Sequence, residues 1–466
     1  MNGKAQFDVV VAGAGGAGTT AALRATEAGR SVLLLDSLAS FRRGCNTYMS
    51  TSMIPAAGTR WQAELGIDDS PQRFYDDVMR KTNGSASPTL TRALVDVGSE
   101  LVSWLADSAG VPLVLGTDFR YPGHSADRCH SVPERSGREL HRRMMARVDA
   151  DDRITLASPM RLVDVTLDDR GKVAEAVIDA PGGSRERVAT SAVVLATGGF
   201  GADRGLVSQH IPEIAGALYF GSEGSDGAAL RIGLGLGTDT GYLDAYQGHG
   251  SVAVPEGILL TWITVTHGAV LINAHGARFG DESTGYSEFA RYVIAQPGGV
   301  AWMVFDRRID ELCRPFQDYA DLLAANGVRW CRDAREIAGL VGAPNGAVEE
   351  TLAACGDSAG GAPDPFGRTN WEAPLTPPFA AVRVTGALFH TQGGILVDGN
   401  AQALRGGVPV PGLYAAGGAA AGISGHGPAG YIAGNGLLAA FGLGYLAGRH
   451  LAGAVRPDEA HPEATL

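Results

Sequence analysis

The chain has 466 residues and a formal net charge of −12, with 19% charged residues and no block of lysine and arginine. This length allows a large core divided over more than one domain, and the acidic balance argues against nucleic acid and anionic membranes as partners. Glycine is abundant, at 66 residues, which suits a backbone that approaches a large ligand closely at many turns.

The first predicted elements form a strand, a glycine-rich turn and a helix. Residues 7–12 are an apolar, valine-rich run that predicts a buried parallel strand. The turn that follows fits the pattern GxGxxG and comprises Gly13, Gly15, Gly16, Ala17 and Gly18. Its first glycine permits a tight turn, its second lets the backbone approach a pyrophosphate, and its third lets helix and strand pack closely.

A second strand is predicted at 31–35 and ends in Asp36. This acid follows Gly18 by 18 residues, the spacing at which a carboxylate accepts hydrogen bonds from ribose hydroxyls. The N-terminus of the intervening helix offers free N–H groups and a partial positive charge to phosphates. Together, these features predict a dinucleotide site, and the spacing alone leaves open which dinucleotide it binds.

Two later stretches complete a pattern that resembles a known family. Residues 191–203 predict a strand with a glycine turn, and residues 411–448 predict a strand, a glycine loop and a long helix. With the N-terminal motif, they resemble the flavoprotein family of fumarate reductases, succinate dehydrogenase flavoprotein subunits and 3-ketosteroid dehydrogenases, over nearly the whole chain. The resemblance implies an α/β fold, in which a Rossmann-like FAD-binding domain with a doubly wound parallel sheet carries an inserted α+β capping domain.

The resemblance also implies FAD as the cofactor and a division of the chain into segments. The FAD-binding segments are expected at 1–244 and 374–466, and the substrate-capping domain at 245–373. The stretch that resembles the family's flavin-side segment holds no histidine for a covalent link, so FAD is expected to be bound non-covalently. The implied cofactor-binding residues are Gly13, Gly15, Gly16, Ala17, Gly18, Asp36, Asn46, Thr47, Ala196, Thr197, Gly198, Asp226, Gly417, Gly418, Gly434, Asn435 and Leu437.

Several fumarate reductase motifs are present, while the charged catalytic groups are replaced. His390 lies in a match to the motif HTxGG, and His249 resembles the histidine at the start of the cap. The arginine that protonates substrate in the reductases aligns with Tyr286, and the arginine that clamps a carboxylate aligns with Tyr431. The two residues of the proton relay align with Trp262 and Val265. A dicarboxylate reductase without these groups would lack bidentate recognition and a proton source.

Ketosteroid dehydrogenases resemble the chain more closely at these positions, because they carry a catalytic tyrosine where Tyr286 stands. In that group the tyrosine removes a proton beside a ketone while hydride leaves the adjacent carbon for flavin N5. The developing enolate needs hydrogen-bond donors, and the loop with His426, Tyr431 and Gly434 could supply them. A tyrosine with an ordinary pKa of about 10 is a poor base at neutral pH, and Tyr121 is the candidate neighbour that would assist it.

Structural roles are the competing interpretation for several of these residues. Tyr286 could serve only packing, and Arg278-Phe279 with Glu282 would then fix the turn that precedes it. His124 and His130 are expected to form local hydrogen bonds. Residues 355–370 are expected to form an exposed loop.

The membrane and the redox compartment are constrained by two further features. Residues 406–448 carry no formal charge and are long enough to span a membrane, but their glycines and polar residues favour a buried helix, so no membrane span is expected. The five cysteines are scattered without a Cys-x-x-Cys pair, which predicts reduced thiols, a cytoplasmic location and no metal site. The N-terminus runs directly into a strand, leaving no room for a signal peptide.

The sequence therefore predicts an FAD-dependent oxidoreductase acting on CH–CH groups. The favoured hypothesis is a dehydrogenase that introduces a double bond next to the ketone of a cyclic substrate, either ketosteroid-like or a small keto acid such as an oxocyclohexanecarboxylate. The proposed catalytic residues are Tyr286, Tyr431, His390, His249, His426 and Tyr121. An ene-reductase acting on an unsaturated carboxylate and a flavin-binding redox protein without turnover are the alternatives, and the electron acceptor stays unknown.

Overall fold

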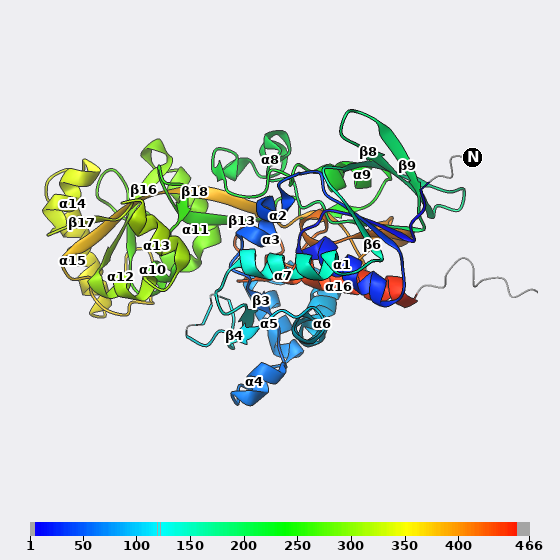
Figure 1. The fold of residues 1–466 in the computed structure, drawn as a ribbon. Helices are drawn as coiled ribbons and strands as arrows, with labels where there is room; N and C mark the ends of the chain where they lie inside the picture. The colour runs from blue at the N-terminus through cyan, green and yellow to red at the C-terminus, as the bar shows by residue number, and fades with distance from the viewer. Residues whose placement is uncertain (1–4, 119, 122, 454–466) are drawn as a thin grey trace, which may run out of the picture. The chain divides into compact units, whose positions relative to one another are not determined.

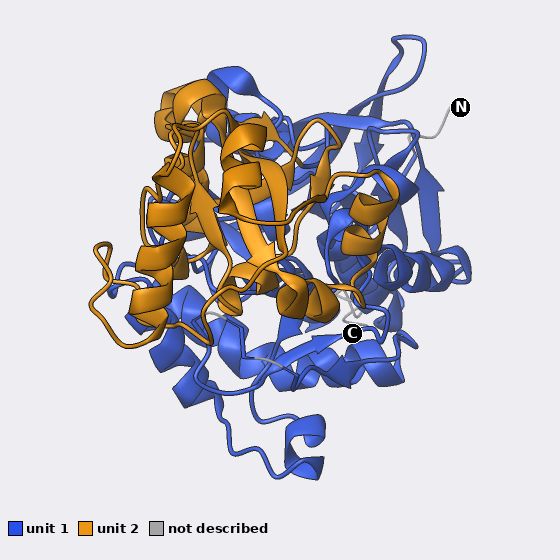
Figure 2. Ribbon diagram, turned by 90° about the vertical axis from the view of Figure 1, so that its left-hand side faces the viewer, with its two compact units in different colours: residues 1–206, 221–245, 390–466 blue, residues 207–220, 246–389 orange. Residues whose placement is uncertain are grey.

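A computed structural model describes residues 5–118, 120–121 and 123–453. The chain divides into two compact units (Figure 2). Unit 1 comprises residues 1–206, 221–245 and 390–466, and unit 2 comprises residues 207–220 and 246–389. Unit 1 is therefore assembled from three separate segments of the chain.

The domain segments predicted from sequence, 1–244, 245–373 and 374–466, stay a prediction about domains. The compact units divide at 245/246 and at 389/390. Residues 374–389 group with unit 2 because β18 (Phe379–Thr391) pairs along most of its length with β16 (Val300–Asp306) of that unit.

The main sheet of unit 1 has six strands in the order β20-β21-β10-β1-β2-β6. Five of them run parallel, and β20 pairs antiparallel to β21. Every residue of β1, β2 and β10 is buried, as expected for strands covered on both faces. Their bounds are β1 Val9–Ala12, β2 Val32–Leu35, β6 Ile154–Ala157, β10 Ala192–Leu195, β20 Gln402–Arg405 and β21 Val408–Ala415. The expected α/β fold with a parallel sheet is confirmed.

Two helices at opposite ends of the sequence cover this sheet side by side. Helix α1 (Gly16–Glu27) contacts α16 (Asn435–Gly453), as Figure 1 shows. Their backbones approach closely, since a Cβ on Gly444 would lie 2.3 Å from the carbonyl oxygen of Ala17. The long uncharged stretch near the C-terminus thus supplies a buried helix. Among the described residues, no helix has the length and apolar character needed to cross a membrane.

Smaller elements complete unit 1. Its minor sheets have the orders β3-β5-β4, β7-β8-β9 and β12-β19. The strands are β3 Ile54–Pro55, β4 Val114–Leu115, β5 Cys129–Ser131, β7 Arg161–Leu167, β8 Val173–Asp179, β9 Arg185–Ala189, β12 Thr240–Gly241 and β19 Gly394–Ile395. The helices are α2 Phe41–Gly44, α3 Asn46–Met49, α4 Arg60–Glu64, α5 Pro71–Lys81, α6 Pro88–Asp107, α7 Gly137–Asp149, α9 Ala228–Gly235 and η4 Gly417–Ala419. Helix α8, Arg204–His210, spans the first unit boundary.

Unit 2 is built on a seven-stranded sheet in which β14-β13-β18-β16-β15 form the main path, and β11 and β17 also pair with β18. Its other strands are β11 Leu218–Tyr219, β13 Tyr246–Ala253, β14 Ile258–Leu259, β15 Val270–Ile272 and β17 Arg329–Cys331. Its helices are η1 Pro212–Ile214, α10 Ile263–Thr266, η2 Glu282–Thr284, α11 Tyr286–Ile294, η3 Pro297–Gly299, α12 Arg307–Cys313, α13 Gln317–Ala324, α14 Ala334–Val341 and α15 Ala347–Ala359.

The expectation of an exposed loop at 355–370 is confirmed for most of residues 360–370, which are irregular and largely exposed, but it was wrong for 355–359 and for two buried side chains. Helix α15 continues to Ala359, and the side chains of Asp364 and Arg368 are almost fully buried. Both are held by ion pairs to the turn before α11, Asp364 with Arg278 and Arg368 with Glu282. The glycines and prolines of this stretch indicated irregular backbone, but not the buried ion pairs that hold it inside.

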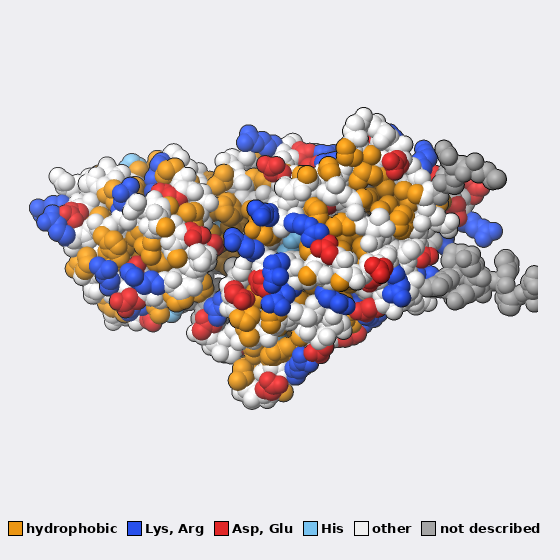
Figure 3. Space-filling model, viewed as in Figure 1, with side chains coloured by type: hydrophobic (Ala, Val, Ile, Leu, Met, Phe, Trp, Pro, Cys, Tyr) orange, Lys and Arg blue, Asp and Glu red, His pale blue; other side chains and the backbone are white. Residues whose placement is uncertain are grey.

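Charged side chains of both signs are interspersed on the face of the molecule that Figure 3 shows. All five cysteines are free thiols, and four of them are buried. Burial raises the pKa of Cys129 to about 12, so its thiol stays protonated at neutral pH. Among the described residues, no group of three or more His, Cys, Asp and Glu side chains could hold a metal ion.

Candidate functional site

The glycines of the turn between β1 and α1 differ in how closely other atoms of the protein approach them. Gly13 has φ +108°, and a Cβ there would lie 2.2 Å from the carbonyl oxygen of Ala196. A Cβ on Gly18 would lie 1.8 Å from the carbonyl oxygen of Gly13. Gly15 differs, because a Cβ there would come no closer than 3.7 Å to Thr47 Oγ1. Packing of the protein itself therefore requires Gly13 and Gly18, while a Cβ on Gly15, at the helix N-terminus, would make only ordinary van der Waals contacts.

Asp36 follows β2 at the carboxyl end of the parallel sheet. Its two carboxylate oxygens accept hydrogen bonds of 2.9 Å from the backbone N–H groups of Ala14 and Leu38. Burial raises the pKa of Asp36, and those two N–H groups oppose the rise. A carboxylate has about four acceptor positions, so Asp36 keeps acceptor capacity for the hydroxyls of a ribose.

Asn46 and Thr47 bring α3 against the same turn. The hydroxyl of Thr47 accepts a hydrogen bond of 2.9 Å from the N–H of Gly16. The side chain of Asn46 accepts one of 2.7 Å from the N–H of Ser222 and donates to Ser225 Oγ. Both predicted residues thus tie separate segments of unit 1 together around the turn.

Thr197 and Asp226 flank the start of α9. Thr197 Oγ1 accepts a hydrogen bond from the N–H of Ala229, and Asp226 is paired with Arg161 at 2.7 Å. The other predicted residues lie after β10, in η4 and at the start of α16: they are Ala196, Gly198, Gly417, Gly418, Gly434 and Leu437. The predicted cofactor residues therefore gather around the carboxyl ends of parallel strands, where open α/β sheets bind ligands.

Asn435 gives the clearest indication of a missing polar ligand. It opens helix α16, follows Gly434 with its φ of +84°, and is fully buried. Within the described part of the chain, neither polar atom of its amide has a hydrogen-bond partner. Buried polar groups are paired in more than about 90% of cases, because leaving one unpaired costs about 1–3 kcal/mol. A buried amide with neither atom paired fits a site completed by a polar cofactor, and the residues present fit FAD.

A histidine and a tyrosine meet beside this helix. The rings of His390 and Tyr431 lie edge to face, with centroids 5.9 Å apart. Gln392 Nε2 lies 2.9 Å from Nδ1 of His390, and the carbonyl oxygen of Thr391 lies 3.4 Å from the same nitrogen. The amide nitrogen can only donate, and its contact is the shorter, which favours the imidazole proton on Nε2. That nitrogen lies close to the helix, since a Cβ on Gly436 would be 3.0 Å from it.

Both rings of this pair are neutral hydrogen-bond donors. Burial lowers the pKa of His390 to about 4, so its ring is uncharged at neutral pH. Burial also raises the pKa of Tyr431, an effect that the N–H groups of Gly436 and Gly434 oppose. The phenol therefore keeps its proton. Unit 1 presents an N–H and an O–H donor side by side.

The other two predicted residues of unit 1 have different surroundings. His426 is exposed and forms a hydrogen bond of 2.9 Å with Asp244, while its ring lies against Tyr242. Tyr121 is partly buried, and burial raises its pKa. The structure thus pairs Tyr431 with His390, and it places His426 on an exposed acid.

In unit 2, Tyr286 and His249 are stacked. Tyr286 is the first residue of helix α11, and its ring centroid lies 4.9 Å from that of His249 with an interplanar angle of 19°. Phe389 also stacks with the imidazole, and Trp262 meets it edge-on. The alignment of Trp262 with a charged relay residue of the reductases stays a prediction; its side chain is 7% exposed and contacts the rings of His249 and Phe289.

The turn before Tyr286 is held by a buried ion cluster. Glu282 is fully buried and binds Arg278 through two hydrogen bonds of 3.0 and 2.6 Å. It also accepts hydrogen bonds from Arg368 and from the N–H of Leu271. The predicted anchoring role of Glu282 is confirmed, and this anchoring fixes the start of the helix that carries Tyr286.

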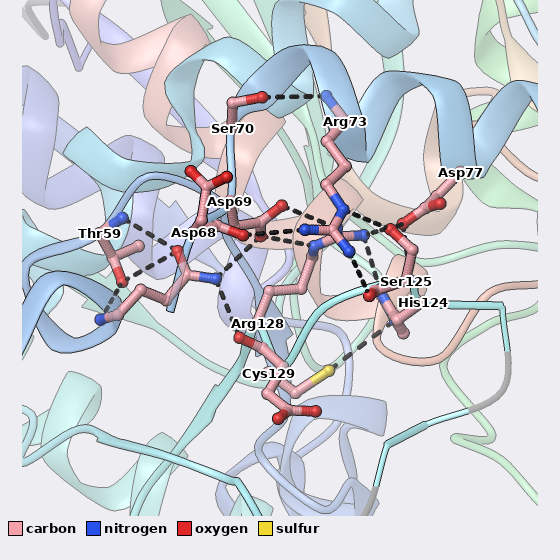
Figure 4. A network of polar contacts seen from close by, with 12 residues as sticks. Thr59, Asp68, Asp69, Ser70, Arg73, Asp77, His124, Ser125, Arg128 and Cys129 are labelled. Atoms are coloured by element: carbon pink, nitrogen blue, oxygen red, sulfur yellow. Dashed lines mark hydrogen bonds and ion pairs between the residues drawn. The ribbon is translucent and has the colours of Figure 1, made fainter. Parts of the chain in front are cut away.

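A second buried ion cluster, shown in Figure 4, supports the loop that carries Tyr431. Arg128 is fully buried and binds Asp69 through two hydrogen bonds of 2.9 Å. It donates another of 2.5 Å to Asp77. Burial alone would raise the pKa of Asp77, but hydrogen bonds from Ser125 and Arg128 lower it to about 2. The carboxylate is therefore charged at every physiological pH.

His124 connects this cluster to the loop of Tyr431. Its Nε2 lies 2.9 Å from the carbonyl oxygen of Ala433, and its Nδ1 lies 3.3 Å from Arg128 Nη1. The carbonyl can only accept a hydrogen bond and the guanidinium can only donate one, so the proton of the neutral ring is on Nε2. Burial, and then Arg128, lower the pKa of His124 to about 4. His124 was expected to form local hydrogen bonds, and this was wrong for its bond to the carbonyl of Ala433, which lies 309 residues away. His130 contacts Thr59 and the carbonyl of Arg128.

Sequence reasoning missed Gln392 and Ser251, which orient the two histidines. Ser251 Oγ lies 3.1 Å from Nδ1 of His249, and Gln392 contacts His390 as described. In each case the partner follows the histidine by two residues. Side chains at this spacing share one face of an extended strand, so strand periodicity was the signal that could have found both.

Comparisons with known proteins agree with this geometry. The model of a family described as an FAD binding domain matches residues 8–437. The chain is 29% identical to NADH:fumarate oxidoreductase of Klebsiella pneumoniae (strain 342), over 96% of its own length and 48% of that protein. It thus spans about half of that relative. It is 28% identical to a fumarate reductase (cytochrome) of Shewanella frigidimarina, over 96% of its own length and 77% of that protein.

A further relative and two solved structures extend the comparison. The chain is 27% identical to 4-oxocyclohexanecarboxylate 2-dehydrogenase of Sinomonas cyclohexanicum, covering 97% of the chain and 93% of that protein. An open flavocytochrome c3 fumarate reductase has a TM-score of 0.82 at 26% identity, covering 97% of this chain and 79% of that one. A 3-ketosteroid-Δ4-(5α)-dehydrogenase from Rhodococcus jostii RHA1 has a TM-score of 0.75 at 24% identity, covering 97% and 98%. This last likeness concerns the fold alone.

Proposed function

The chain belongs to the FAD-binding domain family and is an FAD-dependent oxidoreductase acting on carbon–carbon bonds, and from this premise we propose that it is a dehydrogenase of cyclic ketones. The reaction introduces a double bond between the carbon adjacent to the carbonyl and the carbon after it. When bound, FAD supplies the acceptor of the hydride at N5. The residues of this chain supply the proton acceptor and the donors that polarise the ketone.

One observation carries the proposal: a tyrosine is paired with a neutral histidine in each unit. Tyr286 is stacked on His249, and Tyr431 meets His390 edge to face. Neutral donors suit a ketone oxygen, on which partial negative charge grows as the enolate forms. A dicarboxylate would call instead for the bidentate grip of arginine, and tyrosines stand at both positions that align with reductase arginines.

The roles follow from the chemistry of the side chains. The phenolate form of Tyr286 takes the proton from the carbon adjacent to the ketone, and so becomes the neutral phenol, as hydride leaves the next carbon. The Nε2–H of His390 and the O–H of Tyr431 donate to the ketone oxygen. The likeness to 4-oxocyclohexanecarboxylate 2-dehydrogenase supports a ring ketone as the substrate class. His426 and Tyr121 have secondary roles in this proposal, because His426 is paired with an exposed acid and Tyr121 is held protonated by burial.

The test uses the FAD-loaded protein under anaerobic conditions. Addition of a saturated cyclic ketone or keto acid is expected to bleach the visible flavin band. Tyr286→Phe is expected to slow bleaching by about 10²- to 10⁴-fold, the usual contribution of a general base, with the FAD spectrum intact. Tyr292→Phe, on the same helix and 36% exposed, is the matched control and should bleach at the normal rate. Equal rates for the two variants would return Tyr286 to a packing role.

An ene-reductase is the second candidate, favoured by the fumarate reductases among the relatives. Tyr286 would then donate its proton to an unsaturated carboxylate. In this case saturated ketones would leave the flavin oxidised, and the chemically reduced protein would be re-oxidised by an unsaturated acid. The same two phenylalanine variants would separate catalysis from packing in that direction.

A further inference from the structure

The imidazole of His249 is enclosed so that only its two nitrogens can make polar contacts. It lies on β13, 5% exposed, between the stacked rings of Tyr286 and Phe389, whose centroids lie 4.9 and 5.2 Å from its own. Trp262 closes one edge at 5.7 Å. Ser251, two residues further along the strand, shares its face and reaches Nδ1.

The hydrogen bonds of Ser251 fix the proton of this ring. Its Oγ lies 2.7 Å from the carbonyl oxygen of Leu260 and 3.1 Å from Nδ1 of His249. A carbonyl oxygen can only accept, and a serine hydroxyl has one proton to donate. That proton goes to Leu260, so the hydroxyl oxygen must accept from an N–H at Nδ1. Burial lowers the pKa of His249 to about 3, and the neutral ring has one proton. Nε2 therefore carries a lone pair.

We propose that Nε2 of His249 accepts a hydrogen bond from a hydroxyl or N–H group of the substrate, so that the protein selects cyclic ketones bearing such a donor over those bearing a carboxylate. This inference rests on the proposed function, since it assigns a further part of that substrate. A carboxylate beside Nε2 would bring two hydrogen-bond acceptors together in a buried environment, where neither could be paired. An unpaired buried acceptor weakens binding on the order of tenfold to a hundredfold.

The two histidines then have complementary chemistry. His390, whose Nδ1 accepts from Gln392, offers an N–H. His249, whose Nδ1 donates to Ser251, offers an acceptor. The residue that follows each histidine by two positions decides whether Nε2 of that histidine is a hydrogen-bond donor or an acceptor. Ser251 is thus a positioning residue for specificity, and it acts through the tautomer of His249.

The first test reads the tautomer directly. The FAD-loaded protein is labelled with ¹⁵N-histidine, and the His249 resonances are identified as those missing from His249→Gln. The proposal expects a protonated Nδ1 and an unprotonated Nε2 in the native chain and in Ser251→Thr, which keeps the hydroxyl. In Ser251→Ala the population protonated at Nε2 should rise. A proton on Nε2 of the native protein would overturn the inference.

The second test measures selectivity by ligand-induced changes in the flavin spectrum. The ligands are a hydroxycyclohexanone and the matching oxocyclohexanecarboxylate. The native chain should bind the hydroxyketone at least about tenfold more tightly, and Ser251→Ala should lose most of this preference while Ser251→Thr keeps it. Tighter binding of the carboxylate by the native protein would contradict the proposal. The tautomer is measured without ligand, so this inference can fail independently of the proposed function. The proposed function fails if no ketone bleaches the flavin.

Discussion

Replacing Arg128 by methionine tests whether the buried ion cluster holds unit 1 together. Methionine fills much of the same space but leaves the buried carboxylates of Asp69 and Asp77 without the guanidinium of Arg128. Asp69 would keep its hydrogen bond from Gln62, and Asp77 would keep those from Ser125 and its ion pair with Arg80. Removing one partner of a buried pair costs about 3–5 kcal/mol, because the other charge is left uncompensated. The free energy of unfolding at pH 7 should fall by that amount.

The pH dependence of this loss has a definite sign. The folded pKa of Asp77, about 2, lies below its unfolded value of about 3.9. Its ionisation therefore contributes between about 2 and 3 kcal/mol of stability above pH 3.9, which is lost as the pH falls toward 2. Without Arg128, the pKa values of the two acids should rise, so that they take up protons at mildly acidic pH. The destabilisation by Arg128→Met should thus be smaller at pH 4.5 than at pH 7.

Urea unfolding followed by the fluorescence of released FAD is the assay, because the predicted FAD residues lie in unit 1. Arg120→Met is the matched control. Arg120 forms an ion pair of 3.2 Å with Asp127 but is 56% exposed, and exposed pairs contribute about 0–1 kcal/mol. Equal losses for Arg128→Met and Arg120→Met, or a loss that does not change between the two pH values, would refute the reasoning.

Two further predictions concern the cofactor turn and the loop of Tyr431. Gly18→Ala should abolish FAD retention, since its Cβ would lie 1.8 Å from a backbone oxygen. Gly15→Ala should instead fold normally and only weaken FAD affinity. Flavin absorbance measures the retained FAD and thermal melts of the two apoproteins measure stability; equal melting temperatures would contradict the prediction. The depressed pKa of His124, about 4 against an unfolded 6.5, should cost up to about 3 kcal/mol of stability as the pH falls from 6.5 to 4. His124→Gln, which does not titrate, should show a shallower fall in urea midpoint, and an unchanged slope would count against the assignment.

The sequence was sufficient for features in which neighbours along the chain decide the outcome. The strand, glycine turn and helix at the N-terminus follow from apolar runs and from glycines whose Cβ positions would collide with backbone. Glu282 could be identified as an anchor because its partner, Arg278, is only four residues away in the sequence. Strand and helix boundaries agreed within a few residues for the same reason.

Long-range partners could not be read from the sequence. Arg128 and Asp77 are separated by 51 residues, and Arg368 and Glu282 by 86. Arg368 stands in the stretch that the composition assigned to an exposed loop, and only the fold shows that these charges neutralise one another inside. The tautomer of His249 depends in turn on Ser251, whose hydroxyl donates to the carbonyl oxygen of Leu260. No local pattern of residues predicts this hydrogen bond.

The division of unit 1 into three segments has a consequence for biosynthesis. Strand β1 is synthesised long before β21, which completes its sheet, and α16, which covers it. Unit 2 lies almost wholly within one continuous segment and can form while the rest is still being made. The pairing of α1 with α16 joins residues more than 400 positions apart, and such non-local contacts slow folding because a long loop must close first. Until then, the apolar strands of the FAD-binding sheet lack their cover, and the nascent chain depends on chaperones or on rapid completion to avoid aggregation.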